Sequence, residues 1–262
     1  MTPSICTNCF TEANIAEVFD GCAEAGFDVS IGLSDISSYG IDFLIREQAR
    51  SKVGVSSVSM IGFFTDDPRD MEHDCLIEHC AALKCPRLTV VTGGIKKQSQ
   101  TITHYKDQVL RGLDPLLPRA AAAGVTLFLE PFHPMFATSR SALVDSLSAV
   151  EIIEATDRQL GLMIDTYHLW HERNFLANLG TWIKEYHCCV QISDWPFDGR
   201  SIFRDRCQVG DGAIDFPGVF SALKKSAYQG AVEFEVMSDR YRSMGISGFI
   251  SDCVGRWNKF NV

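Results

Sequence analysis

The sequence is poor in several features that mark particular classes of protein. It has seven histidines in 262 residues, and its 24 Lys and Arg are outnumbered by 33 Asp and Glu, so the formal net charge is −9. A negative surface repels phosphate backbones and anionic lipids. No run approaches the ~18 to 20 consecutive apolar residues that a membrane span requires. We therefore expect neither a nucleic-acid partner nor a membrane partner.

The residues after Met1 also lack a targeting signal. The segment TPSICTNCFTEAN has no basic region, no apolar core and no small-residue cleavage site, so we expect a cytoplasmic protein. The ten cysteines are then expected to be reduced thiols rather than a disulfide framework. Cys6 and Cys9 form a lone CxxC without a convincing second pair of ligands, which favours buried thiols over a structural zinc site.

What the sequence does contain is a regular alternation of two kinds of segment. Short β-branched runs alternate with longer segments of helical period, without a low-complexity break, and this indicates one α/β domain over residues 1–262. The expected strands are 4–6, 27–32, 53–60, 88–92, 125–130, 161–165, 188–193 and 231–237. The expected helices are 11–25, 41–52, 69–84, 104–123, 140–155, 173–186, 216–227 and 241–257. Eight successive strand–helix units predict a single (β/α)8 TIM barrel.

An open, doubly wound sheet is the alternative architecture. Such a sheet normally carries a glycine-rich phosphate loop after its first strand, and here the segment Thr7 to Phe10 occupies that place. Gly26, Gly124 and Gly230 follow three of the expected helices. Because a left-handed residue commonly ends a helix before the next strand, we expect a positive φ at each of these glycines.

Polar side chains close the last four expected strands, and in a TIM barrel the C-terminal ends of the strands carry function. These side chains are Glu130, Asp165, Gln191 with Asp194, and Glu233 with Glu235. The period of two along a strand places them on faces that can converge as three carboxylates and an amide. Enclosed carboxylates repel one another, and a divalent cation compensates for this. An all-oxygen set of ligands suits Mg²⁺ or Mn²⁺ better than Zn²⁺.

Each of these residues also has a structural interpretation. A single carboxylate at a strand end often caps the following helix. Similarly, His133 or His168 alone is as readily a hydrogen-bonded loop histidine. The presence of such residues on four consecutive strands favours a shared site.

Five segments resemble one known family: LEPFHPMFATSRS, MIDTYHLW, VQISDWP, DRCQVGDGAIDFPGVFSAL and YQGAVEFEVMS. They are similar to the sugar-phosphate isomerase/epimerase family of xylose-isomerase-like TIM barrels, which includes hydroxypyruvate isomerases and ketose 3-epimerases. The resemblance runs from Gly26 onward and is most specific between Glu130 and Ser238. It implies one divalent metal ion, Mn²⁺ or Mg²⁺ ahead of Co²⁺ or Zn²⁺, held by residues from strands five to eight.

Carried over by position, the resemblance assigns the metal ligands to Glu130, Asp165, Gln191 and Glu235, with Glu233 as the alternative for the last. The departure from the family is Gln191, where the usual ligand is histidine. A glutamine there is similar to hydroxypyruvate isomerases and 3-dehydroshikimate dehydratases of the same fold, and its carbonyl oxygen can still coordinate a metal.

The resemblance also implies the chemistry, which moves a proton on a carbon next to a carbonyl. The metal would stabilise an enediolate, while Glu130 and Glu235 would remove and return the proton. His168, Arg206 and, with less support, His133 would bind the substrate, a small carbohydrate-like molecule such as a sugar, sugar phosphate or hydroxy-oxo acid. Family members commonly form homodimers or homotetramers, which we take as the expectation here.

Three other functions are compatible with the same barrel. A lyase would remove the same proton and expel a hydroxyl from an inosose or from 3-dehydroshikimate. A DNA-repair enzyme resembling endonuclease IV would need a His-rich three-metal site in a basic groove, and the seven histidines and the charge of −9 argue against it. A non-catalytic barrel would bind no metal at the strand ends.

Overall fold

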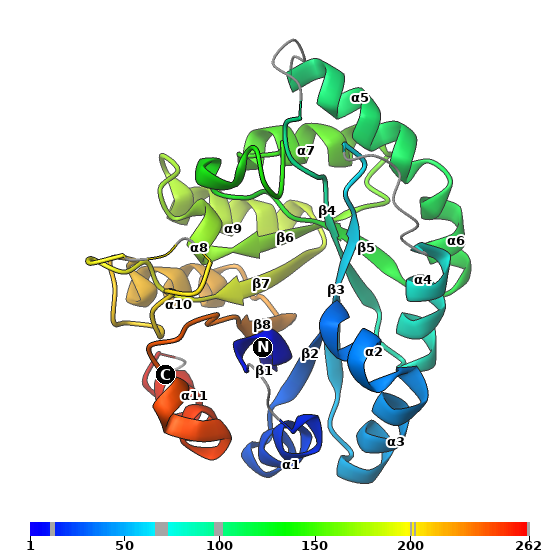
Figure 1. The fold of residues 1–262 in the computed structure, drawn as a ribbon. Coiled ribbons are helices and arrows are strands. Elements are labelled where there is room, and N and C mark those ends of the chain that lie inside the picture. Colours follow the sequence, from blue (N-terminus) through cyan, green and yellow to red (C-terminus); the bar gives the residue numbers. More distant parts are fainter. Residues whose placement is uncertain (11–13, 66–72, 97–101, 200, 202, 261–262) are drawn as a thin grey trace.

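The computed structural model of the protein describes residues 1–10, 14–65, 73–96, 102–199, 201 and 203–260. Its eight strands are β1 (Thr2–Cys6), β2 (Asp28–Gly32), β3 (Val55–Gly62), β4 (Arg87–Val91), β5 (Thr126–Leu129), β6 (Gly161–Asp165), β7 (Cys188–Ile192) and β8 (Ala231–Phe234). They pair in parallel and in chain order, and β1 also pairs with β8, so the sheet closes on itself (Figure 1). The predicted TIM barrel is confirmed, and the alternative open sheet is excluded.

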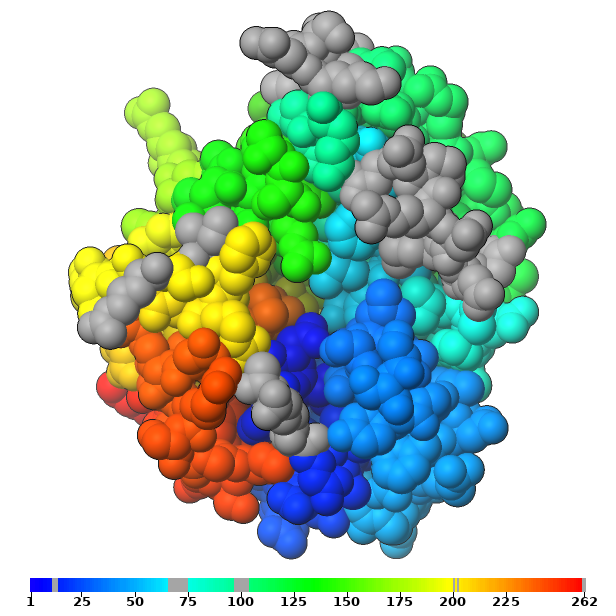
Figure 2. All heavy atoms as spheres, viewed as in Figure 1, coloured from blue at the N-terminus to red at the C-terminus, as the bar shows by residue number. Residues whose placement is uncertain are grey.

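The helices surround this barrel on its outside (Figure 1). They are α1 (Ile15–Ala25), α2 (Leu33–Tyr39), α3 (Ile41–Ser51), α4 (His73–Ala82), α5 (Ile102–Leu113), α6 (Leu116–Ala122), α7 (Ser146–Ala155), α8 (Thr166–Leu169), α9 (Phe175–Glu185), α10 (Phe216–Lys225) and α11 (Gly245–Phe260). Single 3₁₀ turns are η1 (Thr7–Cys9), η2 (Pro134–Phe136) and η3 (Arg242–Met244). Helix α11 packs beside α1, so the first and last helices of the chain lie side by side on the outside of the barrel. Figure 2 shows the same meeting of early (blue) and late (orange and red) segments on the viewed face.

Several helix boundaries differ from the sequence prediction. The single helix expected over 104–123 is two helices, because Pro115 restricts the backbone before it and ends α5 at Leu113. The helix expected from Arg140 begins only at Ser146, where the side chain of Asp145 accepts a hydrogen bond from the Ser148 amide and caps it. The expected starts at Thr11 and Arg69 lie outside the described residues.

Two of the three predicted left-handed glycines are confirmed. Gly26 and Gly124 have φ angles of 70° and 71°. The third prediction is wrong, because Ala227 takes the left-handed conformation after α10, with φ of 54°. Gly230 serves a close contact instead, since a Cβ there would lie 2.3 Å from the Tyr228 hydroxyl oxygen.

The inside of the barrel changes from apolar to polar along the strands. Phe128, Met163, Cys189 and Ala231 form a buried apolar layer. Each of them stands two residues before a polar residue on the same strand face: Glu130, Asp165, Gln191 and Glu233. The polar layer therefore lies two residues beyond the apolar layer, toward the C-terminal ends of the strands. Among the described residues, the structure contains no helix long and apolar enough to cross a membrane.

Candidate active site

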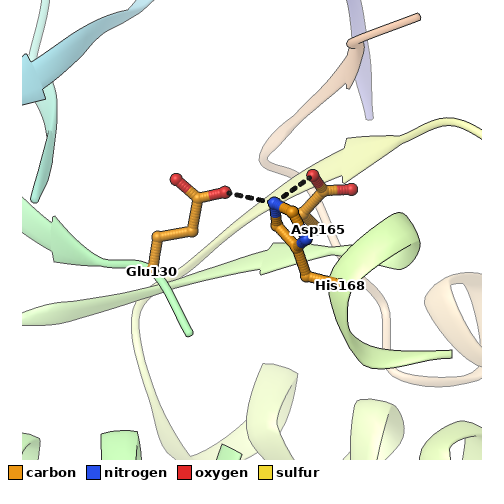
Figure 3. Close-up of side chains that lie close together, drawn as sticks. All are labelled: Glu130, Asp165 and His168. Carbon is orange, nitrogen blue, oxygen red and sulfur yellow. Dashed lines mark ion pairs between the residues drawn. The ribbon is translucent and has the colours of Figure 1, made fainter. Parts of the chain in front are cut away.

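The end of β6 brings three polar side chains together. Asp165 Oδ1 accepts a hydrogen bond of 2.9 Å from the backbone amide of Tyr167, so the chain turns directly into α8. This turn carries His168 back over the barrel, where Nε2 lies 3.5 Å from Asp165 Oδ2 and 3.8 Å from Glu130 Oε1 (Figure 3). Glu130, Asp165 and His168 each offer a ligand atom, and these atoms lie within 4.8 Å of one another. Asp165 thus acts as a helix cap and as a member of the cluster.

The burial of this cluster shifts the proton affinities of its members. Burial, reinforced by the negative charges of Glu235 and Asp165, raises the pKa of Glu130 well above its ordinary value. Burial likewise raises the pKa of Glu235 to about 8, against the lowering effect of Arg206 and with the help of Asp165. The pKa of His168 is well below its ordinary value, because burial and then the Arg206 charge disfavour the imidazolium. Without a metal, Glu235 therefore retains its proton near neutral pH, beside a neutral His168.

Arg206 supplies a buried positive charge to the cluster. Its Nη1 lies 2.7 Å from Asp165 Oδ2 and 3.0 Å from Glu235 Oε2, and it also donates to Ser193 Oγ at 3.1 Å. The guanidinium carbon lies 4.5 Å from the centroid of the Tyr167 ring. Burial disfavours the guanidinium charge, yet Asp165 and Glu235 outweigh this and raise the pKa of Arg206. Arg206 thus links the carboxylates of β6 and β8.

Two short antiparallel bridges hold Arg206 in this position. Asp194 pairs with Cys207, and Asp205 pairs with Ser238, one on each side of Arg206 in the sequence. The carboxylate of Asp194 also accepts hydrogen bonds from the backbone amides of Trp195, Gly210, Gly212 and Ile214. Asp194, which closes an expected strand, is therefore an anchor for the loop that carries Arg206.

Gln191 and Glu233 lie side by side at the floor of the site. Gln191 Nε2 donates to Glu233 Oε2 at 3.2 Å, while Gln191 Oε1 is buried and has no hydrogen-bond partner among the described residues. The two carboxylate oxygens of Glu233 accept hydrogen bonds from Ser56 Oγ at 2.7 Å and Ser57 Oγ at 3.0 Å. Since Glu233 is held by these contacts and Glu235, directly after β8, shares Arg206 with Asp165, the structure favours Glu235 as the carboxylate that faces Asp165.

His133 stands apart from the carboxylate cluster. Its Nδ1 accepts a hydrogen bond of 3.2 Å from the Met135 amide, and its ring stacks on Trp195 with centroids 4.8 Å apart. Burial, then the neighbouring His171, lowers the pKa of His133 to about 4, so it is neutral near pH 7. The histidine belongs to an aromatic wall that includes Tyr167, whose ring lies 4.8 Å from that of Trp195.

The sequence analysis missed other contributors to the site. Phe132 stacks on the imidazole of His168 with centroids 4.1 Å apart. Ser56 and Ser57 reach the site from β3, a strand on which no candidate was expected. Phe132 carries a signal, because it follows Glu130 in the segment LEPFHP, whereas consecutive serines in a strand carry none.

Comparisons with known proteins agree with this architecture. A family model described as xylose isomerase-like TIM barrel matches residues 19–248. A solved structure of a protein from Sinorhizobium meliloti 1021 is 25% identical, with 98% of this chain and 97% of that chain covered and a TM-score of 0.88. The IolI protein, solved with a bound zinc atom, is 20% identical over 100% and 98% of the two chains, with a TM-score of 0.83. The 3-keto-D-glucoside 4-epimerase of E. coli is 18% identical over 99% of each chain, with a TM-score of 0.78. No protein of curated function is similar enough in sequence to match.

Proposed function

Because the chain belongs to the xylose isomerase-like TIM-barrel family, we propose that it is a metal-dependent isomerase or epimerase of a small hydroxy-carbonyl compound. The observation that carries this proposal is the convergence of Glu130, Asp165 and His168, whose ligand atoms lie within 4.8 Å of one another. Two structural neighbours support it: the IolI protein was solved with a bound zinc atom, and the E. coli protein is a 3-keto-D-glucoside 4-epimerase.

The residues present fit a divalent cation. Glu130, Asp165, Gln191 and Glu235 would hold it through oxygen atoms, a set that suits Mn²⁺ or Mg²⁺. The buried Gln191 Oε1, without a partner among the described residues, is the kind of orphan acceptor that a cation satisfies. His168 Nε2 offers a nitrogen in the same cluster. When bound, the cation would polarise the substrate carbonyl and stabilise the negative charge that develops on its oxygen.

Two buried carboxyl groups would handle the proton. Glu130 and Glu235 follow β5 and β8, and both are buried in the site, where a carboxylate can accept a proton from the substrate and return it. One would remove the proton next to the carbonyl. The other would deliver a proton to the neighbouring carbon in an isomerisation, or to the opposite face in an epimerisation.

Two further residues would position the substrate. Arg206 would bind a hydroxyl or carboxylate oxygen through its guanidinium donors, while Tyr167 fixes the plane of that group. His168, neutral and packed against Phe132, would donate or accept one hydrogen bond to a substrate hydroxyl. His133 and Trp195 would close one side of the substrate pocket with their stacked rings.

The experiment is solvent exchange at the α-carbon. Mn²⁺-loaded protein is incubated in D₂O with a panel of ketoses, 2-oxo acids and cyclitols, and exchange is followed by proton NMR. We expect exchange with at least one of these compounds and a loss of about 10²- to 10⁴-fold in Glu235→Gln. Glu151→Gln, at an exposed ion pair with Lys106, is the matched control and should exchange at the wild-type rate. Folded, Mn²⁺-loaded Glu235→Gln that exchanges as fast as wild type would show the assignment to be wrong. An alkene in the spectrum would identify a dehydratase instead.

A further inference from the structure

The floor of the site contains a carboxylate that the proposed chemistry does not use. Glu233 is fully buried, and its hydrogen-bond partners among the described residues are neutral: Ser56, Ser57, Gln191 and the Cys6 and Cys189 thiols. It does not share the Arg206 guanidinium, which contacts Asp165 and Glu235. A buried carboxylate surrounded only by neutral donors is costly to maintain, so its position calls for an explanation.

Strand β3 contains a bulge that places two hydroxyl groups against Glu233. In the pairing of β2 with β3, Val29 is opposite Val55 and Ser30 is opposite Ser57, so Ser56 is an extra residue in β3. Successive residues of a regular strand point to opposite faces, whereas a bulge allows two consecutive side chains to point the same way. Here both Ser56 and Ser57 donate to Glu233.

A second row of serines completes the network. Ser4 Oγ lies 2.7 Å from Ser56 Oγ, and Ser30 Oγ lies 2.7 Å from Ser57 Oγ. Each outer hydroxyl can donate to the inner one, which then directs its single proton to Glu233. Both carboxylate oxygens are thus fixed, and Oε2 retains the capacity to accept from Gln191.

This arrangement decides the orientation of the Gln191 amide. A carboxylate oxygen accepts hydrogen bonds and repels another acceptor, so the NH₂ end of Gln191 must face Glu233. The carbonyl oxygen is then held on the other side of the amide, where it is buried without a partner among the described residues. Without Glu233, either end of the amide could face the site.

We propose that Glu233 is a positioning residue that fixes the Gln191 amide so that Oε1, rather than the NH₂ group, is presented to the cation. This inference rests on the proposed function, because it assumes that Gln191 is one of the metal ligands. It explains how an amide replaces the histidine expected at this position. A histidine ligand is oriented by a hydrogen bond from its second nitrogen, and Gln191 has the same requirement for an acceptor behind it.

The test measures the affinity for Mn²⁺ alone by titration calorimetry in wild type, E233Q, Q191E and the double variant. In E233Q the new amide can donate to Gln191 Oε1 and turn that oxygen away from the site. We expect Mn²⁺ affinity to fall about 10- to 100-fold, as it does when partners of metal ligands are removed. In Q191E both terminal atoms are oxygens, so there is no orientation to lose, and E233Q should not weaken Mn²⁺ binding in that background.

Rescue by Q191E separates positioning from charge. A loss of the same factor in both backgrounds would mean that Glu233 acts only through its negative charge or through the fold, and would overturn the inference. Unchanged affinity in E233Q would overturn it as well. E151Q is the matched control, because it makes the same substitution at an exposed ion pair with Lys106, away from the site, so Mn²⁺ affinity should not change.

Two further outcomes keep the test decisive. Should E233Q not fold, E233D retains the charge but withdraws the oxygen from Gln191, and it should lose Mn²⁺ affinity that Q191E again restores. A wild-type chain that binds no Mn²⁺ would overturn the proposed metal site, and the role of Glu233 with it. Wild-type binding with no effect of E233Q or E233D would overturn only the role of Glu233.

Discussion

The two halves of the barrel interior solve the burial of polar groups in different ways. Strands β5 to β8 and the residues directly after them contribute the charged and amide side chains: Glu130, Asp165, Gln191, Glu233 and Glu235. Strands β1 to β4 contribute buried hydroxyls: Ser4, Ser30, Ser56, Ser57 and Thr89. We call these sets the charged half and the hydroxyl half. In the charged half, Asp165 and Glu235 share the Arg206 guanidinium and repel each other. The serines of the hydroxyl half form a network of hydrogen bonds.

This difference suggests separate contributions of the two halves to the proposed metal site. Positive charge relieves repulsion among the carboxylates of the charged half, so that half would gain most from a bound cation. The hydroxyl half donates hydrogen bonds to Glu233 and would change little. Glu233 has polar contacts with both halves.

The largest effect is expected from removing the Arg206 guanidinium, the positive side chain of the charged half. Arg206→Met leaves Asp165 and Glu235 buried without a positive partner, so the metal-free protein should lose about 3 to 5 kcal/mol of unfolding free energy. Saturating Mn²⁺ should restore much of this loss, as measured by urea unfolding. Arg158→Met, at an exposed ion pair with Glu154, is the control and should change stability little. An equal change in the two variants would contradict the comparison.

The charged half should also make stability depend on pH. Because the folded-state pKa of Glu235 is raised from 4.5 to about 8, the folded metal-free protein holds a proton there that the unfolded chain releases. The lowered pKa values of His168 and His133 have the opposite effect, but they act mainly below pH 7, because an unfolded histidine, with a pKa of about 6.5, is mostly neutral above that pH. Unfolding free energy should therefore fall as the pH rises from about 7 to 8.

Two measurements check this dependence on pH. Glu235→Gln should flatten the slope of unfolding free energy against pH in the metal-free protein. Saturating Mn²⁺ should also flatten the slope, because carboxylate ligands must lose their protons to bind a metal, so Glu235 would then be ionised in both the folded and the unfolded state. A metal-free wild type whose unfolding free energy rises from about pH 7 to 8 would contradict the raised pKa of Glu235.

A smaller effect is expected from the hydroxyl half. Ser56→Ala and Ser57→Ala each remove one donor from Glu233, and each should lower the unfolding free energy by about 1 to 3 kcal/mol. The loss should be nearly the same with and without Mn²⁺, in contrast to the loss in Arg206→Met. If Mn²⁺ restored the unfolding free energy lost in Ser56→Ala or Ser57→Ala, the two halves would respond to the metal in the same way, and the comparison would be wrong.

The smallest effect concerns a hydroxyl that faces no carboxylate. Thr89 Oγ1 is buried and, among the described residues, has no hydrogen-bond partner. Thr89→Val has nearly the same shape without the unpaired hydroxyl, so we expect unfolding free energy to stay level or to rise by roughly 1 kcal/mol. Thermal unfolding beside Ser57→Ala would compare the two hydroxyls directly, and an equal loss in both would contradict the distinction.

The sequence predicts the charged half far better than the hydroxyl half. Glu130 and Asp165 stand out because a carboxylate at the end of an apolar strand is unusual. Ser56 and Ser57 do not stand out, because serine is common in strands, and the bulge that turns both inward depends on the pairing with β2. The role of Arg206 came from the resemblance alone, since its position depends on bridges to residues distant in the sequence.

The fold itself follows from the alternating pattern, with local exceptions. All eight strands were predicted, because buried runs between helical segments are distinctive. The short helices α2 and α8 were missed, since seven and four residues are too few to show a helical period. The break at Pro115 could have been predicted, whereas Ala227 could not, because alanine rarely adopts a left-handed conformation.

The anchoring of the Arg206 loop by Asp194 has a consequence for how such a protein can diversify. The loop is fixed at its base, by the two bridges and by the amides that donate to the Asp194 carboxylate. Phe197, which is 83% accessible, takes no part in these anchors. We therefore expect substitutions of the Phe197 side chain to leave the Arg206 guanidinium in place. Such substitutions would change the surface that an incoming molecule meets at the rim of the barrel, while the candidate site beneath it keeps its geometry.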